Sequence, residues 1–176
     1  QFRQEEGEAG RAAGVLSPGH NSVYYDGETG RYFLIFHQRF TDRGEAHEVR
    51  VHEMFINENG WPVVSPFRFD GGAVRAFTPE QLTGTWKLIN HQRNNNPTPY
   101  LSRTVTFAPD GTLSGGWEGT WELGGDGKTA RVTLNGTRFD GVFLRSWDAD
   151  NGMWVQAFTA LSANGTALWG AGAALG

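Results

Sequence analysis

Residues 17–22 read SPGHNS and open a stretch, residues 16–69, whose pattern decides the fold. Short apolar or alternating runs follow one another in this stretch, at residues 22–25, 32–37, 48–57 and 61–69. The turn sequences DGETG and ENG separate successive runs, and Asn-Gly is a strong hairpin signal. Four short strands joined by tight turns predict one small antiparallel sheet.

The composition of the 176-residue chain limits its class. Its 25 glycines and seven tryptophans, set among many Thr and Val, favour an all-β protein with numerous tight turns. The net charge of -4, with no run of Lys or Arg, argues against nucleic acid and anionic membranes as partners. The absence of cysteine excludes a disulfide scaffold, a thiolate zinc site and a cysteine nucleophile. No apolar stretch approaches the ~20 residues that a membrane-spanning helix needs.

The second half of the chain predicts a different β structure. A Gly- and Ala-rich linker is expected at residues 70–80, and Thr-Pro at 78–79 predicts one short helical turn. Eight strand-like segments then recur between Asp-Gly and Asn-Gly turns, which suits hairpins closing into a small antiparallel barrel over residues 81–176. These segments are residues 84–91, 102–107, 112–116, 119–123, 130–134, 137–147, 153–161 and 166–170. Residues 1–15, rich in Gln, Glu and Arg but broken by glycine, are expected to form an arm of uncertain structure.

The sheet predicted at residues 16–69 has about the size of one β-propeller blade, and a single blade cannot bury both of its faces. Its phrases SPGHNSVYYDGETGRYFLIFHQRF and HEVRVHEMFINENGWPVV resemble the last blade of endo-α-1,5-L-arabinanases of glycoside hydrolase family 43. LTGTWKLINH, GTWEL, GVFLRSWD and FTALSANGTALWG resemble the β-barrel domain that follows that propeller. The resemblance implies a last blade at residues 16–69, a C-terminal barrel, and a secreted bacterial enzyme that hydrolyses arabinan with inversion. The chain is expected to be a piece of a longer polypeptide whose signal peptide lies outside it.

The resemblance also implies where the catalytic groups lie. Inverting glycosidases use two carboxylates flanking the scissile bond, and in this family both come from earlier blades. No catalytic residue is therefore predicted in this chain, and the chain alone is expected to be inactive. Four glutamates in the blade, Glu45, Glu48, Glu53 and Glu58, stand in polar or turn contexts typical of solvated structural residues. The expected partners are the remainder of the propeller, on the same or a separate polypeptide, and an arabinan-type polysaccharide; the exposed blade also predicts pairing between copies of the chain.

Histidines supply the metal candidate. By residue type alone, His20 in a Pro-Gly turn is more often a residue that hydrogen-bonds turn backbone, but the resemblance implies that it ligates Ca²⁺ in the propeller channel. His37 ends an apolar strand and is interpreted as a core histidine, with the channel as the alternative. His47 and His52 are an odd number of residues apart and face opposite ways. His91, in a polar loop, is expected to be exposed.

The tryptophans raise a second function. An aromatic platform for sugar rings would make the barrel a non-catalytic carbohydrate-binding module on plant cell-wall polysaccharide, although most tryptophans in small barrels fill the core. Trp117 is the best candidate for substrate binding because glycines flank it. A third interpretation, a lipocalin-like pocket for an apolar ligand, follows from an eight-stranded barrel alone.

Overall fold

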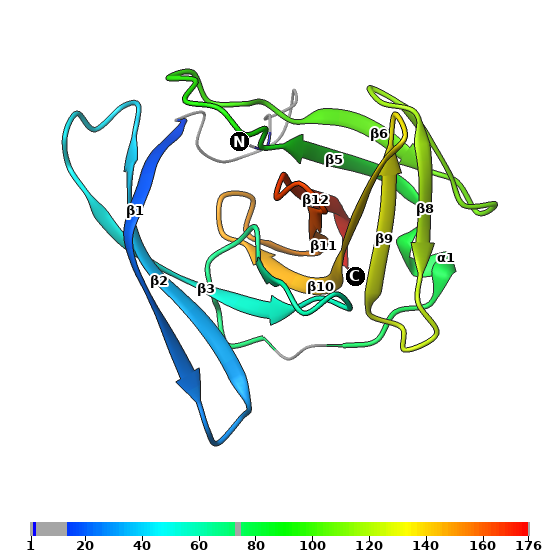
Figure 1. Ribbon diagram of the computed structural model, residues 1–176, viewed down its shortest axis with the longest axis horizontal. Helices are drawn as coiled ribbons and strands as arrows, with labels where there is room; N and C mark the ends of the chain where they lie inside the picture. Colours follow the sequence, from blue (N-terminus) through cyan, green and yellow to red (C-terminus); the bar gives the residue numbers. More distant parts are fainter. Residues whose placement is uncertain (1, 3–13, 73–74, 176) are drawn as a thin grey trace.

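The computed structural model describes Phe2 and residues 14–72 and 75–175. Within them the chain forms a four-stranded antiparallel sheet and a closed, eight-stranded antiparallel barrel (Figure 1), which confirms the predicted fold class. Most of the predicted arm at residues 1–15 lies outside the described residues. No helix in the described part of the chain is long and apolar enough to cross a membrane.

The sheet runs in the order β1 (Val15–Asp26), β2 (Arg31–Phe40), β3 (Glu48–Ile56) and β4 (Pro62–Val64). Glycines at positive φ close the two predicted turns, Gly30 at 70° and Gly60 at 80°. The SPGHNS segment is part of β1 and not a turn before it. The last strand is also shorter than predicted, because proline lacks the N–H group that continues a ladder; beyond β4 only single bonds to β3 remain, such as Ser65 N–H to Glu53 O at 2.8 Å.

The barrel closes in the order β10-β11-β12-β5-β6-β7-β8-β9, so its first strand in the chain pairs with its last. The one-turn helix α1 (Pro79–Leu82) precedes it, where Thr78 N–H donates to Gln81 Oε1 at 2.9 Å. The barrel strands are β5 (Gly84–Asn90), β6 (Arg103–Phe107), β7 (Thr112–Gly115), β8 (Gly119–Leu123), β9 (Thr129–Leu134), β10 (Thr137–Asp148), β11 (Met153–Ser162) and β12 (Ala167–Ala174).

Aromatic side chains fill the interior of the barrel. Trp86 stacks on Phe107 with ring centroids 4.9 Å apart, and Phe143 and Phe158 pack against Trp86 at 6.0 and 5.7 Å. All four are at most 1% exposed. Gly170 leaves the room for this cluster, since a Cβ there would lie 2.1 Å from a ring carbon of Phe158. The protein's own side chains therefore occupy the space in which a lipocalin-like barrel would hold an apolar ligand.

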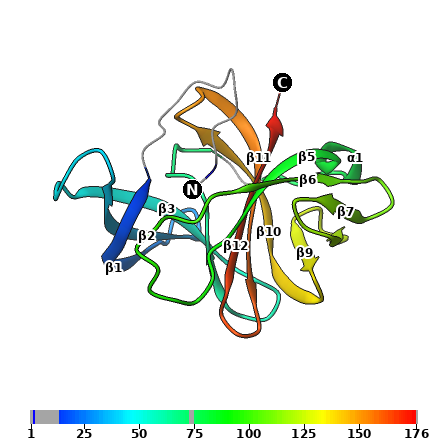
Figure 2. The same cartoon turned by 90° about the horizontal axis from the view of Figure 1, so that it is seen from above.

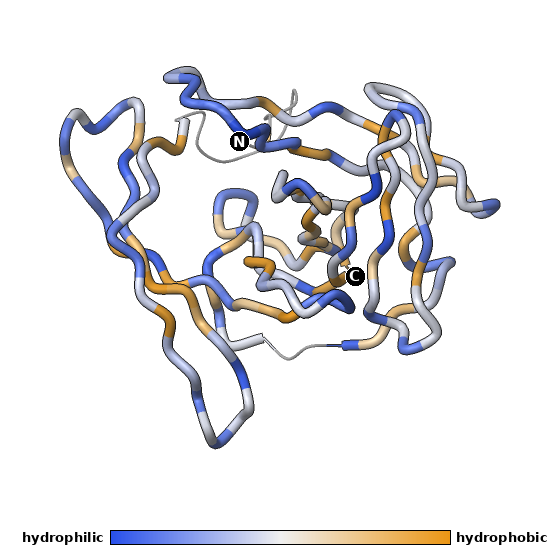
Figure 3. The backbone as a smooth tube through the Cα atoms, viewed as in Figure 1, coloured by the Kyte–Doolittle hydropathy of each residue, from blue (hydrophilic) through white to orange (hydrophobic). Residues whose placement is uncertain are grey.

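The sheet lies to one side of the barrel, and its β1–β2 hairpin points away from it (Figures 1 and 2). Strand β4 contacts β11, and Val155, Ala157 and Thr159 of β11, which alternate with Phe158, are at most 4% exposed. Hydrophobic segments run along strands of the sheet and of the barrel (Figure 3). Burial on both faces of β11 fixes the sheet against the barrel wall.

Polar contacts at the β3–β4 turn hold the two parts together. Asn57 Nδ2 donates to the Asp140 carbonyl at 3.0 Å, and the Glu58 carboxylate accepts two bonds from Arg131, at 2.8 and 2.6 Å. Arg138 bridges Glu58 and Asp140, at 3.0 and 2.7 Å. We refer to Glu58, Arg131, Arg138 and Asp140 as the Glu58 cluster. It joins a turn of the sheet to strands β9 and β10 of the barrel.

Candidate functional site

His20 lies in an irregular part of β1. The register between β1 and β2 shifts on both sides of Gly19, and Ser17 and His20 have positive φ values of 47° and 50°. A positive φ is costly for a residue other than glycine, and bulges in a strand re-aim side chains, often beside functional sites. The segment thus presents an exposed His20 imidazole from a bulged edge strand.

His37 lies beside His20, and His47 lies beside His37. The ring centroid of His37 is 5.9 Å from that of His20 and 4.5 Å from that of His47. Desolvation, followed by the neighbouring His47, His20 and Arg39, lowers the pKa of His37. His37 is half-buried and stands among histidines, so its interpretation as a core histidine is wrong. The three imidazoles gather at one face of the sheet.

Whether this face fits a calcium ion depends on its donors. Ca²⁺ takes about six to eight ligands, nearly all of them oxygen. Among the described residues, no group of three or more His, Cys, Asp or Glu side chains is placed to hold a metal ion. His20 therefore fits calcium as a single ligand only, and these residues by themselves do not make a complete calcium site.

His52 faces the opposite side of the sheet from His37 and from His47, which contacts His37, and this agrees with the prediction that His47 and His52 face opposite ways. It is 6% exposed, its Nδ1 lies 2.8 Å from the Ser65 carbonyl, and its ring packs on Phe36 with centroids 5.0 Å apart. Burial lowers the pKa of His52. Its hydrogen bond and packing account for it as a structural residue.

The four glutamates of the sheet all pair with arginines, which supports their structural interpretation. Glu53 departs from the prediction of solvation, because it is only 8% exposed and receives two 2.6 Å bonds from Arg31. The other pairs are Glu45 with Arg39, Glu48 with Arg43 and Arg50, and Glu58 with Arg131 and Arg138. Each of these four carboxylates therefore has an arginine partner.

Trp117, the predicted sugar-binding residue, lies in the turn between β7 and β8. It is half-buried and packs against the barrel core. The guanidinium of Arg103 lies 4.9 Å from its ring centroid and covers one face of the indole. Only the remaining surface is left for a sugar ring, and the role of Trp117 stays a prediction.

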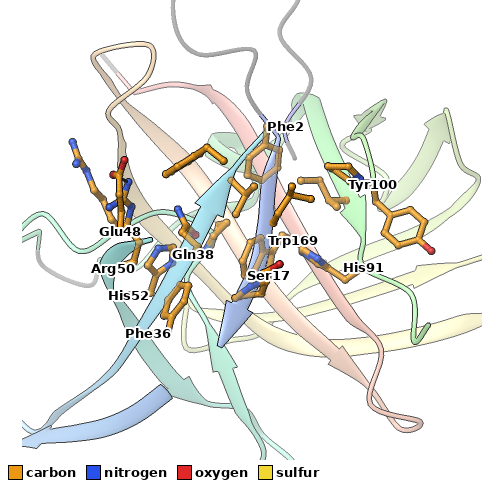
Figure 4. A pocket seen from close by; sticks show the side chains of 18 of the residues that line it. Phe2, Ser17, Phe36, Gln38, Glu48, Arg50, His52, His91, Tyr100 and Trp169 are labelled. Atoms are coloured by element: carbon orange, nitrogen blue, oxygen red, sulfur yellow. Dashed lines mark hydrogen bonds and ion pairs between the residues drawn. The ribbon is translucent and has the colours of Figure 1, made fainter. Parts of the chain in front are cut away.

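A pocket of about 710 Å³ lies between the sheet and the barrel (Figure 4). Its volume is in the range of small-molecule sites, roughly 300–1,000 Å³. Alternate residues of β2 line the sheet side, together with residues of β3, while β5, β12 and the loop at residues 91–100 line the barrel side. The residues that matter most below are Phe36, Gln38, Phe40, His91, Tyr100 and Trp169.

On the barrel side, the structure contradicts the prediction that His91 is exposed. Its Nε2 atom is buried without a hydrogen-bond partner, and its ring packs edge-on against Trp169 with centroids 4.4 Å apart. Burial lowers the pKa of His91 to about 4, so the imidazole is neutral near pH 7. The loop that carries His91 folds back against Trp169. The polar composition of the loop gives no indication of this contact.

On the sheet side, the pocket is lined by one glutamate and three arginines, Glu48, Arg43, Arg50 and Arg68, beside one uncharged amide. Glu48 pairs with Arg43 and Arg50, whose guanidinium groups lie 5.2 and 5.3 Å from the ring centroid of Phe40. Gln38, which carries this amide, is 8% exposed. The pocket therefore has an uncharged polar side chain on each side, and on the barrel side the Nε2 atom of His91 is without a partner.

Comparison with known proteins places the chain in a family. The family model of the GH43 C-terminal lipocalin-like domain matches residues 66–170, more than half of the chain. The chain belongs to this family. The match begins just after β4, so it spans the barrel of this GH43 domain, while the sheet precedes it.

Curated relatives of this GH43 chain extend the similarity to the sheet. The chain is 44% identical over 165 residues to extracellular endo-α-(1→5)-L-arabinanase 2 of Bacillus subtilis, which is 94% of this chain and 35% of the relative. It is 40% identical over 162 residues to the extracellular endo-α-(1→5)-L-arabinanase of Thermotoga petrophila, 91% and 34% respectively. The chain spans about a third of the length of these relatives and corresponds to a C-terminal part of a family 43 arabinanase.

Solved structures agree in the arrangement of sheet and barrel. The family 43 glycoside hydrolase YxiA protein of Bacillus licheniformis superposes with a TM-score of 0.87 at 40% identity, covering 90% of this chain and 36% of that one. The endo-1,5-α-L-arabinanase of Thermotoga petrophila in complex with TRIS gives 0.86 at 37%, covering 90% and 36%. The GH43 chain thus shares with both the joint placement of its two parts.

Sequence reasoning missed the pocket because its walls come from distant positions. Gln38 carries no signal in a strand of mixed residues. His91 directly follows β5 and Trp169 lies within β12, far away in the sequence. The closure of the barrel, which pairs β12 with β5, is what brings them together. Counting alternate residues along β2 tells on which face of the sheet Gln38 lies, but not which part of the fold lies opposite that face.

Proposed function

We propose that this chain is the C-terminal third of an extracellular endo-1,5-α-L-arabinanase, which hydrolyses internal bonds of arabinan. The observation that carries the proposal is the similarity to two proteins named as such enzymes, over 94% and 91% of this chain. The extracellular location rests on the same two names. The chain contributes the last propeller blade and an accessory barrel.

The exposed side chains of the sheet support a role as one blade among several. Val23, Tyr24 and Tyr25 of β1 are 53–55% exposed, and Val49 of β3 is 69% exposed. Apolar surface of this extent on a sheet is typical of an interface, and β1 is an edge strand with one unpaired side. The partner proposed for it is the remainder of the propeller, on the same or a separate polypeptide. A second copy of the chain is the alternative occupant.

The chemistry divides between the chain and that partner. Inverting hydrolysis needs a general acid and a general base on opposite sides of the scissile bond, with room for a water between them. The blade glutamates are tied to arginines, so the proposal assigns both catalytic carboxylates to the partner and predicts that the chain alone is inactive. The proposed role of this chain is to complete the propeller and to present His20.

His20 is proposed as one ligand of a Ca²⁺ ion in the propeller channel. The bulged backbone at Ser17 and His20 supports this role, since strain of this kind concentrates at functional positions. A bound calcium ion would add positive charge near the catalytic carboxylates and favour the ionised form that the general base needs. The other ligands would come from the partner and from water.

The test is reassembly. The chain is co-expressed with the N-terminal two thirds of the Bacillus subtilis relative, and release of reducing ends from linear arabinan is measured. We expect activity from the complex and none from either part. His20→Ala should reduce the activity and its dependence on calcium, whereas His52→Ala, on the other face of the sheet, should leave the calcium dependence unchanged. A complex that forms but cleaves no arabinan would refute the proposed function.

A further inference from the structure

We infer that the pocket between the sheet and the barrel is a second carbohydrate site, which binds a short, neutral oligosaccharide between Gln38 on β2 and His91 with Trp169 on the barrel. Figure 4 shows these side chains on opposite sides of the pocket. The inference rests on the proposed function only for the choice of arabino-oligosaccharide as the probe. It requires no catalytic step.

The first argument comes from the polar groups on the two walls of the pocket. A buried polar group without a hydrogen bond is rare, and each such group calls for a partner such as a water or a ligand. His91 Nε2 is such a group, since it is buried and without a partner. Gln38 adds a side-chain amide on the opposite wall, so a ligand lying between the two walls would bond both.

The second argument concerns the chemistry of that ligand. An amide both donates and accepts hydrogen bonds, and a neutral imidazole does the same through its two nitrogens. Hydroxyl groups also do both, so a polyhydroxylated ligand matches either wall without a charge of its own. Glu48 engages the guanidinium groups of Arg43 and Arg50 on the sheet side, whereas Arg68 also lines the pocket, so a charged sugar is the comparison that tests the contribution of charge.

The third argument is the aromatic and amide lining. Trp169 is half-buried on the outer face of the barrel, where an indole can receive the apolar C–H face of a sugar. In the adjacent loop, Asn94 Oδ1 accepts from Asn96 N–H at 3.1 Å and from Tyr100 Oη at 2.7 Å. Asn96 Oδ1 accepts from Thr98 N–H at 3.0 Å. With both carboxamide oxygens held by the loop, the amide nitrogens remain as donors at the rim.

The size of the pocket sets the length of the ligand. A volume of about 710 Å³ is far more than an ion or a single water needs. It suits an oligosaccharide of a few rings, with aromatic contact at Trp169 and hydrogen bonds at its two ends. The probe that follows is arabinotetraose, with a galacturonate trimer as the charged comparison.

The experiment uses the 176-residue chain and isothermal titration calorimetry, with thermal unfolding of each variant alongside. We expect arabinotetraose to bind; tighter binding of the galacturonate trimer would show that the arginines of the sheet side select the ligand and would overturn the assignment of a neutral sugar. Trp169→Ala should weaken binding by roughly tenfold or more, and Gln38→Leu by roughly fivefold. Trp61→Ala is the matched control, because Trp61 is 62% exposed and does not line the pocket, and it should leave the affinity unchanged. Trp117→Ala tests the alternative sugar-binding residue.

Gln38→Leu gives a readout that a structural residue would not give. Replacing an amide that lines the pocket by an apolar group of similar size removes hydrogen bonds to the ligand while keeping the packing of the wall, so the unfolding temperature should stay nearly the same while sugar affinity falls. No binding of arabinotetraose up to about 10 mM, or binding that only Trp117→Ala weakens, would overturn the inference. Loss of arabinan hydrolysis in the reassembled enzyme would bear on the proposed function and not on this site.

Discussion

The Glu58 cluster predicts that one carboxylate at the β3–β4 turn stabilises the contact between sheet and barrel. The perturbation is Glu58→Gln, which keeps the shape of the side chain and removes its charge. Glu58 accepts bonds from Arg131 at 2.8 and 2.6 Å and from Arg138 at 3.0 Å. The amide of glutamine can accept only part of this set, and its NH₂ group would face a guanidinium.

The magnitude follows from the pKa and the exposure of the carboxylate. Hydrogen bonds from Arg131, and further its charge and that of Arg138, lower the pKa of Glu58 from 4.5 to about 2. One pKa unit corresponds to about 1.4 kcal/mol, but the side chain is 27% exposed, and solvent reduces such pairs to about 0.2–1 kcal/mol each. With two arginine partners we expect a loss of about 1.5 kcal/mol in the free energy of unfolding. For a chain of this size that is about 3–6 °C in Tm.

The pH dependence has a definite sign. The folded pKa lies below the unfolded one, so the stabilisation is fully present above pH 4.5 and is lost as the pH falls toward 2. The Tm difference between wild type and Glu58→Gln should therefore be largest at pH 7 and should nearly vanish at about pH 2. High salt should also reduce it.

Circular dichroism melts at several pH values measure this difference. Glu45→Gln is the control, because Glu45 also pairs with an arginine, Arg39, but its side chain is 87% exposed. We expect its Tm to change by less than about 1–2 °C. Equal effects of the two substitutions at pH 7, or a Glu58→Gln deficit that persists unchanged at pH 2, would refute the reasoning.

Three further predictions concern packing, burial and the metal. Gly141→Ala should destabilise the barrel by roughly 3 kcal/mol in urea titrations, or prevent folding, because a Cβ there would lie 1.8 Å from the Thr159 carbonyl oxygen. Gly125→Ala is the control, since a Cβ there would have no atom within 4 Å, and it should be nearly neutral. An NMR titration should find that His91 protonates near pH 4; since the folded pKa is below the unfolded one, its contribution to stability is present above about pH 6.5 and is lost as the pH falls toward 4. Millimolar CaCl₂ should leave the Tm of the isolated chain unchanged, because His20 is a single ligand; a rise of several degrees would show a complete site.

Most of the fold was predictable because its signals are local. The Asp-Gly and Asn-Gly turns place hairpins directly, and the observed β8 coincides with the predicted residues 119–123. The errors fall where proline and bulges intervene. The segment 61–69 reads as a strand from its apolar residues, yet Pro62 and Pro66 remove donors, and regular pairing covers only Pro62–Val64.

The candidate site was less predictable, because burial of a polar residue depends on what the fold places over it. His91 has the neighbours of a loop residue, but barrel closure sets it against Trp169. Glu53 is a similar case, because strand β3 places it against Arg31 of β2, where the two side chains form an ion pair. Sequence patterns indicate on which face of a strand a side chain lies, but not which other part of the protein packs against that face.

Strand β2 shows why the two proposed sites belong together. Its odd residue His37 lies among the histidines, while the even residues Phe36, Gln38 and Phe40 line the pocket. A slip of one residue in its pairing with β3 would exchange the two sets, so the register that presents Gln38 to the barrel is the same one that sets His37 beside His20. The bulges lie on β1, and β2 pairs with β3 without a shift. The irregularity that aims His20 is thereby confined to the edge strand, and the pocket wall is left regular.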